Sequence, residues 1–177
     1  MLACQTRGSP TVVDVRIEIA SDRHRPTFLQ AARDSRELHG DWVAPPLTAE
    51  AYDTWITRME DERSRAFIVI DPAEFLPAAM VTLSEIVRGP LQSAFVSYYA
   101  LAPYAGRGFV RAALLQVIKH AFTGLRLHRL EANIQPQNEA SKRLIECVGF
   151  TYEGYSPRYL RVKGEWKDHE RWALITP

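Results

Sequence analysis

The segment YALAPYAGRGFVRAALL, from Tyr99 to Leu115, constrains the fold more than any other part of the sequence. Its apolar beginning is typical of a strand, and apolar residues at helical spacing follow its end. Between them, Gly106 and Gly108 flank an arginine. Glycine allows positive φ angles and close approach of the backbone, and free N–H groups at the start of a helix bind phosphate. The segment therefore predicts a strand, a phosphate-binding turn and a helix, although on the glycines alone a turn that binds nothing is an equally good interpretation.

Two familiar phosphate-binding loops do not fit this segment. A Walker loop needs Lys-Ser or Lys-Thr after its last glycine, where this chain has Phe109 and Val110. A dinucleotide-binding fingerprint needs a third small residue, and Arg111 stands in its place. Glu131 could serve as an acidic ribose ligand, but antiparallel strands before the turn do not begin a Rossmann unit. The sequence therefore argues against both loops.

The order of strand and helix patterns predicts a mixed α/β domain. Apolar alternation and β-branched residues indicate strands at residues 12–20, 66–70, 78–87, 94–101, 127–134, 150–156, 158–164 and 165–175. Helical spacing and capping residues indicate helices at residues 26–40, 48–63, 110–124 and 138–149. One strand–helix–strand crossover lies in the middle of this order. We expect a domain of the α+β type, with a mostly antiparallel central sheet flanked by helices.

Composition limits the number of domains and the kinds of partner. A chain of 177 residues with 46% hydrophobic residues is expected to form a single domain over residues 1–177, with residues 1–11 as a flexible N-terminal extension. The net charge of +1 gives no sign of direct nucleic-acid binding, and no apolar run is long enough for a membrane span. Without the apolar core of a secretory signal, a cytoplasmic location is expected. The five histidines do not have the spacing of metal ligands, so no metal site is expected. A homodimer is one oligomeric state that the chain could form.

Three segments together resemble a known family. They are YYALAPYAGRGFVRAAL, LHRLEANIQPQNEASKRLIECVGFTYEG and YLRVKGEWKDHERWAL, which fall within Tyr98–Leu174. In this order they resemble the GNAT superfamily of acetyl-CoA-dependent N-acetyltransferases, in particular the RimJ/RimL-like branch that acetylates N-terminal alanines of ribosomal proteins. The resemblance implies a GNAT-like sheet, acetyl-CoA as the acyl donor and an amine as the acceptor.

The resemblance also implies a role for the two glycines. In the family, a turn of the form Arg/Gln-x-x-Gly-x-Gly/Ala holds the coenzyme A pyrophosphate through its backbone amides. Here the pattern falls on residues 105–110, so the implied ligands are Gly106, Arg107, Gly108, Phe109 and Val110. Ala105 replaces the usual Arg or Gln, which removes a side chain but no amide. Val110 replaces a small residue, so its branched side chain is expected to crowd the phosphate and weaken affinity.

Family likeness places the reacting thioester beside the strand that precedes the turn. A backbone N–H among Tyr99, Ala100 and Leu101 would then point at the thioester carbonyl, where one such donor is worth about 3 kcal/mol. Asn133 is implied as a further coenzyme contact.

Two polar residues at the start of the helix at residues 138–149 complete the implied coenzyme site. Asn138 and Ser141 resemble the family's pantetheine and thiol contacts, and Ser141 would act as the general acid for the leaving thiolate. The alternative is an N-cap asparagine followed by a solvated serine.

Glu85 is the candidate general base for the amine. Strand alternation places it on one face with Val81, Leu83 and Val87, where burial would raise its pKa toward the range that a base needs. The alternatives are that Glu85 points into water or pairs with Arg88, and that water carries the proton.

The acceptor predicted from this resemblance is the N-terminal α-amine of a protein such as a ribosomal protein. One alternative keeps the reaction and changes the acceptor to a small-molecule amine, such as an antibiotic, a polyamine or an amino acid. A second is a binding module that holds coenzyme A and does no chemistry. Release of free thiol in the presence of amines distinguishes this module from both enzymes.

Overall fold

The computed structural model describes residues 13–176, so the expected extension over residues 1–11 lies outside the described residues. Its strands are β1 (Arg16–Ile19), β2 (Arg65–Asp71), β3 (Leu76–Val87), β4 (Ser93–Ala100), β5 (Arg129–Ile134), β6 (Thr151–Val162) and β7 (Glu165–Ile175). Its helices are α1 (Arg25–Asp34), α2 (Arg36–His39), α3 (Ala49–Met59), α4 (Phe109–Lys119) and α5 (Glu139–Cys147), with short helical segments η1 (Asp22–His24) and η2 (His120–Gly124).

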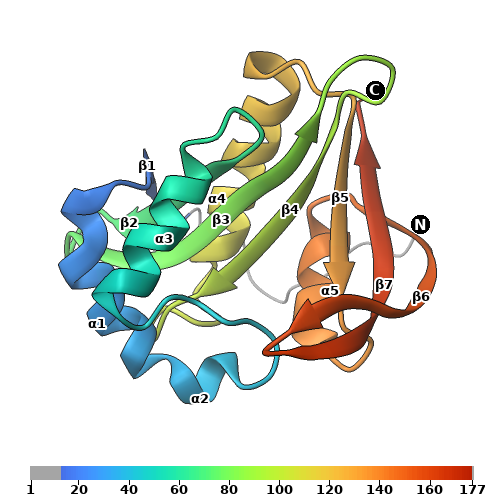
Figure 1. Cartoon of the computed structure of the whole chain (residues 1–177). Helices are drawn as coiled ribbons and strands as arrows, with labels where there is room; N and C mark the ends of the chain where they lie inside the picture. The colour runs from blue at the N-terminus through green and yellow to red at the C-terminus, as the bar shows by residue number, and fades with distance from the viewer. Residues whose placement is uncertain (1–12, 177) are drawn as a thin grey trace.

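All seven strands belong to one sheet in the order β1-β2-β3-β4-β5-β7-β6. Every neighbouring pair is antiparallel except β4 and β5, which are parallel and are connected through α4. The prediction of a mostly antiparallel sheet with one central crossover is therefore confirmed. Figure 1 shows β4 and β5 close together at one end of the sheet and separated at the other.

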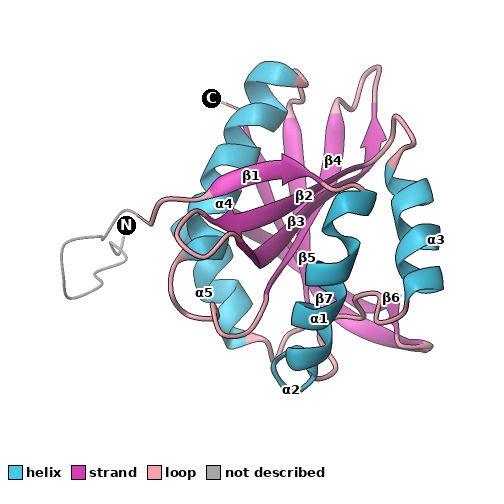
Figure 2. Cartoon of the chain, turned by 90° about the vertical axis from the view of Figure 1, so that its left-hand side faces the viewer, coloured by secondary structure: helices cyan, strands magenta, loops and turns pink. Residues whose placement is uncertain are grey.

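Helices cover both faces of the sheet. Figure 2 shows the sheet between α4 and α5 on one side and α1 and α3 on the other. Leu114 and Val117 of α4 and Ile145 of α5 are buried in the core on the first side. Phe28 of α1 and Tyr52 of α3 are buried in the core on the second side. Burial of these apolar residues, each contributing about 1.5–3 kcal/mol when fully removed from water, holds the helices in place.

Two helix starts form as their sequences predict. The hydroxyl of Thr48 accepts a hydrogen bond from the Ala51 N–H at the start of α3. The side-chain oxygen of Asn138 accepts one from the Ser141 N–H at the start of α5. Such caps are worth about 1 kcal/mol each because they satisfy backbone donors that have no partner within the helix.

The predicted single helix over residues 26–40 is wrong, because the chain turns at Ser35 and forms α1 and α2 separately. The Ser35 hydroxyl donates to the Ala31 carbonyl at 2.6 Å. The same oxygen accepts from the Ala102 N–H at 2.8 Å, beyond the end of β4. A contact 67 residues away in the chain therefore accompanies the break, and periodicity could not reveal it.

Strand boundaries also differ from the predicted ones. The first strand is only Arg16–Ile19 rather than residues 12–20. The segments at residues 150–156 and 158–164 form the single strand β6, whose register against β7 is irregular between Ser156 and Leu160. The boundary predicted at Pro157 therefore corresponds to an irregularity within one strand.

Candidate active site

The centre of the sheet contains a wedge-shaped opening between β4 and β5. Their pairing is limited to Ser93–Phe95 opposite Arg129–Glu131. Beyond Phe95, β4 continues along β3 as far as Ala100, but pairing with β5 has ended. Backbone groups of β4 that would otherwise bond to β5 therefore face the opening.

The direction of the backbone groups at the end of β4 follows from one hydrogen bond. The Leu101 N–H donates to the Ala78 carbonyl of β3 at 2.9 Å. Because N–H groups alternate in direction along a strand, the N–H and C=O of Ala100 point away from β3 and into the opening. The His39 Nε2 to Ala100 oxygen distance of 2.8 Å agrees with this direction. Of the three amides expected near the thioester, the one at Ala100 faces the opening, whereas the Leu101 amide is bonded to β3.

The glycine turn leads from β4 into α4. Gly106 and Gly108 have φ angles of +74° and +91°, which explains why both positions are glycine. Gly108 is the N-cap of α4, so the first backbone N–H groups of this helix lie just after the turn. These donors and the positive end of the helix dipole favour an anion here.

Some residues of the turn line the pocket and others point away from it. Ala105, Gly106, Gly108 and Val110 line the pocket described below. Phe109 is buried in the core, and Arg107 is exposed with its guanidinium 5.0 Å from the centre of the Tyr104 ring. Phe109 can therefore offer only its backbone, whereas the cation of Arg107 is free to approach a phosphate.

Two hydroxyl groups meet on the α5 side of the opening. The Tyr98 hydroxyl lies 2.8 Å from the Ser141 Oγ and 3.2 Å from the Ser141 carbonyl oxygen, to which it can donate. Burial raises the pKa of Tyr98 to about 12, so this phenol keeps its proton at neutral pH. The Asn138 side chain accepts from the Ser141 N–H at 3.1 Å and so holds Ser141 at the start of α5. The structure thus brings Asn138 and Ser141 together and adds Tyr98.

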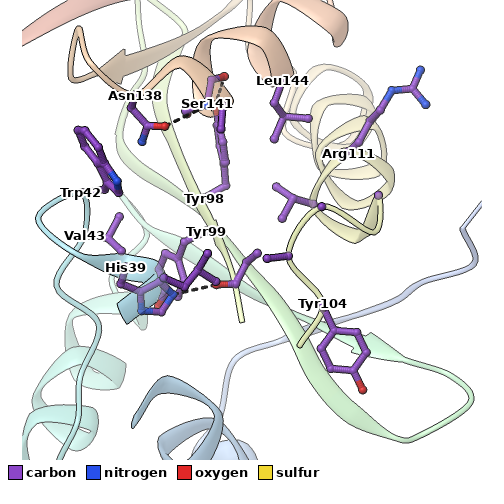
Figure 3. Close-up of a pocket in the computed structure, with 17 residues that line it drawn as sticks. His39, Trp42, Val43, Tyr98, Tyr99, Tyr104, Arg111, Asn138, Ser141 and Leu144 are labelled. Carbon is purple, nitrogen blue, oxygen red and sulfur yellow. Dashed lines mark hydrogen bonds between the residues drawn. The ribbon is translucent and has the colours of Figure 1, made fainter. Parts of the chain in front are cut away.

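These groups line one pocket of about 500 Å3 (Figure 3). Its lining residues are Leu38, His39, Trp42, Val43, Tyr98, Tyr99, Ala100, Tyr104, Ala105, Gly106, Gly108, Val110, Arg111, Asn138, Ala140, Ser141 and Leu144. The pocket connects the glycine turn and the start of α5 with the segment after α2. Neither aspartate nor glutamate occurs among these described lining residues.

The buried position expected for Glu85 is wrong, and the alternative in which its side chain points into water is confirmed. A register irregularity between Ser84 and Val87 interrupts the alternation of β3, and Glu85 has a φ of +48°. Its side chain is 59% exposed and forms an ion pair with Arg63 at 2.9 Å, not with Arg88. Glu85 is not among the residues that line the pocket, so the buried position expected for a base is missing.

Asn133 and Leu101 also lie outside the pocket lining. Asn133 lies on β5 opposite Arg171 of β7, and its buried side-chain oxygen has no hydrogen-bond partner among the described residues. Leu101 is fully buried in the core beneath α1 and α3. Leu101 therefore contributes packing where a coenzyme contact was expected.

His39 was not among the residues predicted for the site. Its ring is 5% exposed, lines the pocket and lies edge-on against Tyr99, with ring centres 5.1 Å apart. The sequence separates His39 from its partner Ala100 by 61 residues, and no local pattern connects them. Trp42 also lines the pocket.

Replacing Glu85 with glutamine is expected to leave the catalytic rate within twofold of the unaltered protein, because this carboxylate is exposed and ion-paired outside the pocket. An exposed pair of this kind contributes about 0–1 kcal/mol to stability. The rate of thiol release at several pH values measures this effect. A large loss of rate with a shifted pH profile would restore Glu85 as the base.

Within residues 13–176, no cluster of three or more His, Cys, Asp or Glu side chains is arranged to hold a metal ion. In the same part of the chain, no helix has both the length and the apolar character that crossing a membrane requires.

Comparison with known proteins agrees with this architecture. The sequence model of the acetyltransferase (GNAT) domain matches residues 15–151. A ribosomal-protein-S5-alanine acetyltransferase from Vibrio fischeri has a similar structure, with a TM-score of 0.82 and 25% identity over 91% of this chain and 92% of that one.

Three curated relatives differ in what their names state. A probable N-acetyltransferase, YjcK of Bacillus subtilis, is 33% identical over 68% of this chain and 66% of its own length. The ribosomal protein uS5-alanine N-acetyltransferase of Escherichia coli is 33% identical over 63% of this chain and 57% of its own length. A spermidine N(1)-acetyltransferase of Vibrio cholerae is 24% identical over 84% of this chain and 86% of its own length. The chain thus spans somewhat less than two thirds of the first two relatives.

Proposed function

This chain belongs to the acetyltransferase (GNAT) domain family, and from that premise we propose that it transfers the acetyl group of acetyl-CoA to the N-terminal α-amine of a protein. The pocket offers separate positions for the two substrates. The glycine turn and α5 serve the coenzyme, and the segment around Trp42 serves the acceptor.

The coenzyme is held mainly by backbone groups. The amides of Gly106, Gly108, Phe109 and Val110 at the start of α4 bind the pyrophosphate. The Arg107 N–H instead donates to the Tyr104 carbonyl at 3.2 Å, so Arg107 adds only the positive charge of its side chain nearby. The pantetheine arm then follows the opening between β4 and β5 past Asn138. Val110 lines the pocket with a branched side chain, which supports a looser fit at the phosphate than a small residue would give.

Three groups stabilise the charges that form during transfer. The Ala100 N–H donates to the thioester oxygen as it becomes negative, a contribution of about 3 kcal/mol in comparable sites. Ser141 Oγ donates to the departing thiolate, and Tyr98 supports it through the 2.8 Å contact between the hydroxyls. Tyr99 forms part of the wall, and burial raises the pKa of its phenol, so it too stays neutral.

The proton of the amine leaves through water. Among the described residues that line the pocket there is no carboxylate to accept it, and Glu85 lies elsewhere. Orientation of two bound substrates can supply much of the acceleration without a protein base.

The choice of a protein N-terminus over a polyamine rests on the absence of carboxylates from the described pocket lining. A polyamine brings further ammonium groups, which are costly to remove from water unless anionic partners receive them. An N-terminal residue such as alanine brings one amine, a small apolar side chain and a peptide group. The name of the E. coli relative, an alanine N-acetyltransferase of ribosomal protein uS5, supports the same acceptor class.

A small amine remains the second candidate because the spermidine N(1)-acetyltransferase aligns with most of this chain. The further ammonium groups of a polyamine acceptor would then have to bind to carboxylates outside the pocket lining. Asp41 and Glu170 are charged residues of this kind on the described surface near the segment after α2 and on β7.

An acceptor panel tests the proposal. We expect peptides that begin with alanine to give a kcat/KM at least about tenfold higher than spermidine or single amino acids, because about 1.4 kcal/mol of differential transition-state binding is a tenfold difference. The measurement is free thiol release, with mass spectrometry of the peptide to locate the acetyl group. Preference for spermidine would overturn the acceptor assignment, and absence of thiol release with every amine would favour a coenzyme A-binding module.

A further inference from the structure

The end of β4 is held by side chains where a neighbouring strand is missing. Pairing with β5 ends at Phe95, so the last residues of β4 have β3 on only one side. A backbone segment with one free edge is easily displaced, because half of its hydrogen-bonding groups have no fixed partner. This is also the place where the Ala100 N–H must stay aimed at the thioester.

Ser35, between α1 and α2, and His39, the last residue of α2, form hydrogen bonds to this free edge. The Ser35 hydroxyl accepts from the Ala102 N–H at 2.8 Å, and Ser35 itself is completely buried. The ring Nε2 of His39 lies 2.8 Å from the Ala100 carbonyl oxygen. The His39 N–H donates a hydrogen bond to the Ser35 carbonyl oxygen at 2.9 Å. The two contacts therefore come from one hydrogen-bonded turn of the chain.

The hydrogen bond between His39 and the Ala100 carbonyl shows which ring nitrogen of His39 carries the hydrogen. A carbonyl oxygen only accepts hydrogen bonds, so Nε2 must carry the hydrogen. Burial lowers the pKa of His39, which keeps the ring neutral at physiological pH with the hydrogen on Nε2 and a lone pair on Nδ1. Tyr99 lies against the ring, and the positive charge of Lys163 from the β6–β7 turn lowers the pKa further. Nδ1 is buried and has no partner among the described residues.

We propose that Ser35 and His39 are positioning residues that replace the missing strand and aim the Ala100 N–H at the thioester carbonyl. This proposal rests on the proposed acetyl transfer. The hydrogen bond from the His39 Nε2–H holds the Ala100 carbonyl on the side of the opening. The hydrogen bond from the Ala102 N–H to the Ser35 hydroxyl holds the chain just after β4. Within a strand, the N–H and C=O of one residue point in the same direction. Holding the Ala100 C=O therefore also fixes the direction of the Ala100 N–H.

The same turn connects the acetyl site with the acceptor side of the pocket. Trp42 lines the pocket three residues after His39, and its N–H donates to the His39 carbonyl at 2.9 Å. Lys163 binds the Gly40 carbonyl and lies 3.7 Å from the Asp41 carboxylate. An acceptor that displaces this segment therefore also moves the side chains that hold the end of β4.

The sharpest test compares two substitutions of His39. Glutamine keeps an N–H donor close to the position of Nε2, whereas leucine fills similar space without a donor. We expect His39→Leu to lower kcat by about ten- to a hundredfold with the KM for acetyl-CoA unchanged within threefold, because a misplaced donor costs rate rather than coenzyme binding. We expect His39→Gln to recover the rate to within about threefold of the unaltered protein. If His39→Gln is as slow as His39→Leu, donation to Ala100 is not the role of His39 and the proposal is wrong.

Amide hydrogen exchange tests the proposal independently of activity. Ser35→Ala removes the acceptor of the Ala102 N–H, and we expect exchange at Ala102 to become at least about tenfold faster, with exchange in β2 unchanged as evidence of an intact fold. Unchanged exchange at Ala102 would overturn the positioning role. If the unaltered protein transfers acetyl groups to no acceptor, the proposed function fails, while the exchange measurement still decides whether Ser35 holds this edge.

Discussion

Replacing Gly106 with aspartate is expected to weaken coenzyme A binding about a hundredfold. The new carboxylate would lie in the turn whose amides we propose to bind the pyrophosphate. Two like charges about 4 Å apart repel by about 4 kcal/mol at the effective dielectric near a protein surface, and the exposure of this turn reduces that to roughly 2–3 kcal/mol. Isothermal titration calorimetry with coenzyme A measures the effect directly.

Asparagine at the same position is the matched control. Asn and Asp have nearly equal size, and both tolerate the left-handed backbone that the φ of +74° at Gly106 requires. Apart from its two chain neighbours, no described residue has an atom within 4 Å of a Cβ placed there, so residues 13–176 crowd neither variant. Gly108 is less suitable, because its Cβ would meet the Val13 side chain at 3.1 Å. Equal affinities of the Gly106→Asp and Gly106→Asn variants would remove the turn from the coenzyme site.

The second large effect is expected at Ser141. Ser141→Ala should lower kcat by about a hundredfold, because loss of a general acid typically costs a factor of 10² to 10⁴. The affinity for coenzyme A should change little, since the glycine turn that we propose for the pyrophosphate lies at the other end of the pocket. Single-turnover measurement of thiol release separates this chemical step from binding and product release.

Two further variants interpret the Ser141 result. Tyr98→Phe should lower kcat less, by about tenfold, because Tyr98 acts on the leaving group only through its 2.8 Å contact with Ser141. Ser97→Ala on the exposed face of β4 is the serine control and should leave the rate unchanged. A Ser141→Ala variant as fast as the Ser97→Ala variant would mean that the thiolate leaves without help from Ser141.

Local patterns predicted most of the elements that build the coenzyme side of the site. The glycine turn, the start of α4 and the Asn138 cap depend on residues within a few positions of one another. Their geometry follows from backbone sterics and short-range hydrogen bonds, which a sequence displays directly. The same is true of the β4–α4–β5 crossover, whose strands and helix each have a clear apolar period.

Local patterns failed where the chain departs from regular spacing. Alternation placed Glu85 on the buried face of β3, but the irregularity after Ser84 turns its side chain outward to Arg63. Helical periodicity runs through residues 26–40 without a break, yet the helix ends at Asp34 and restarts after Ser35. In both places a partner far away in the chain, Arg63 or Ala102, accompanies the departure.

The sequence by itself determined that the chain forms a mixed sheet with a glycine turn before its central helix, because periodicity, capping and glycine act over a few residues. Only the tertiary structure decided which polar groups share the pocket. Tyr98 meets Ser141 across 43 residues and His39 meets Ala100 across 61. Such pairs form because β4 and β5 diverge, which leaves polar groups of both strands without a partner in the sheet. Their partners come from elements far away in the sequence, so no short segment of the sequence predicts them.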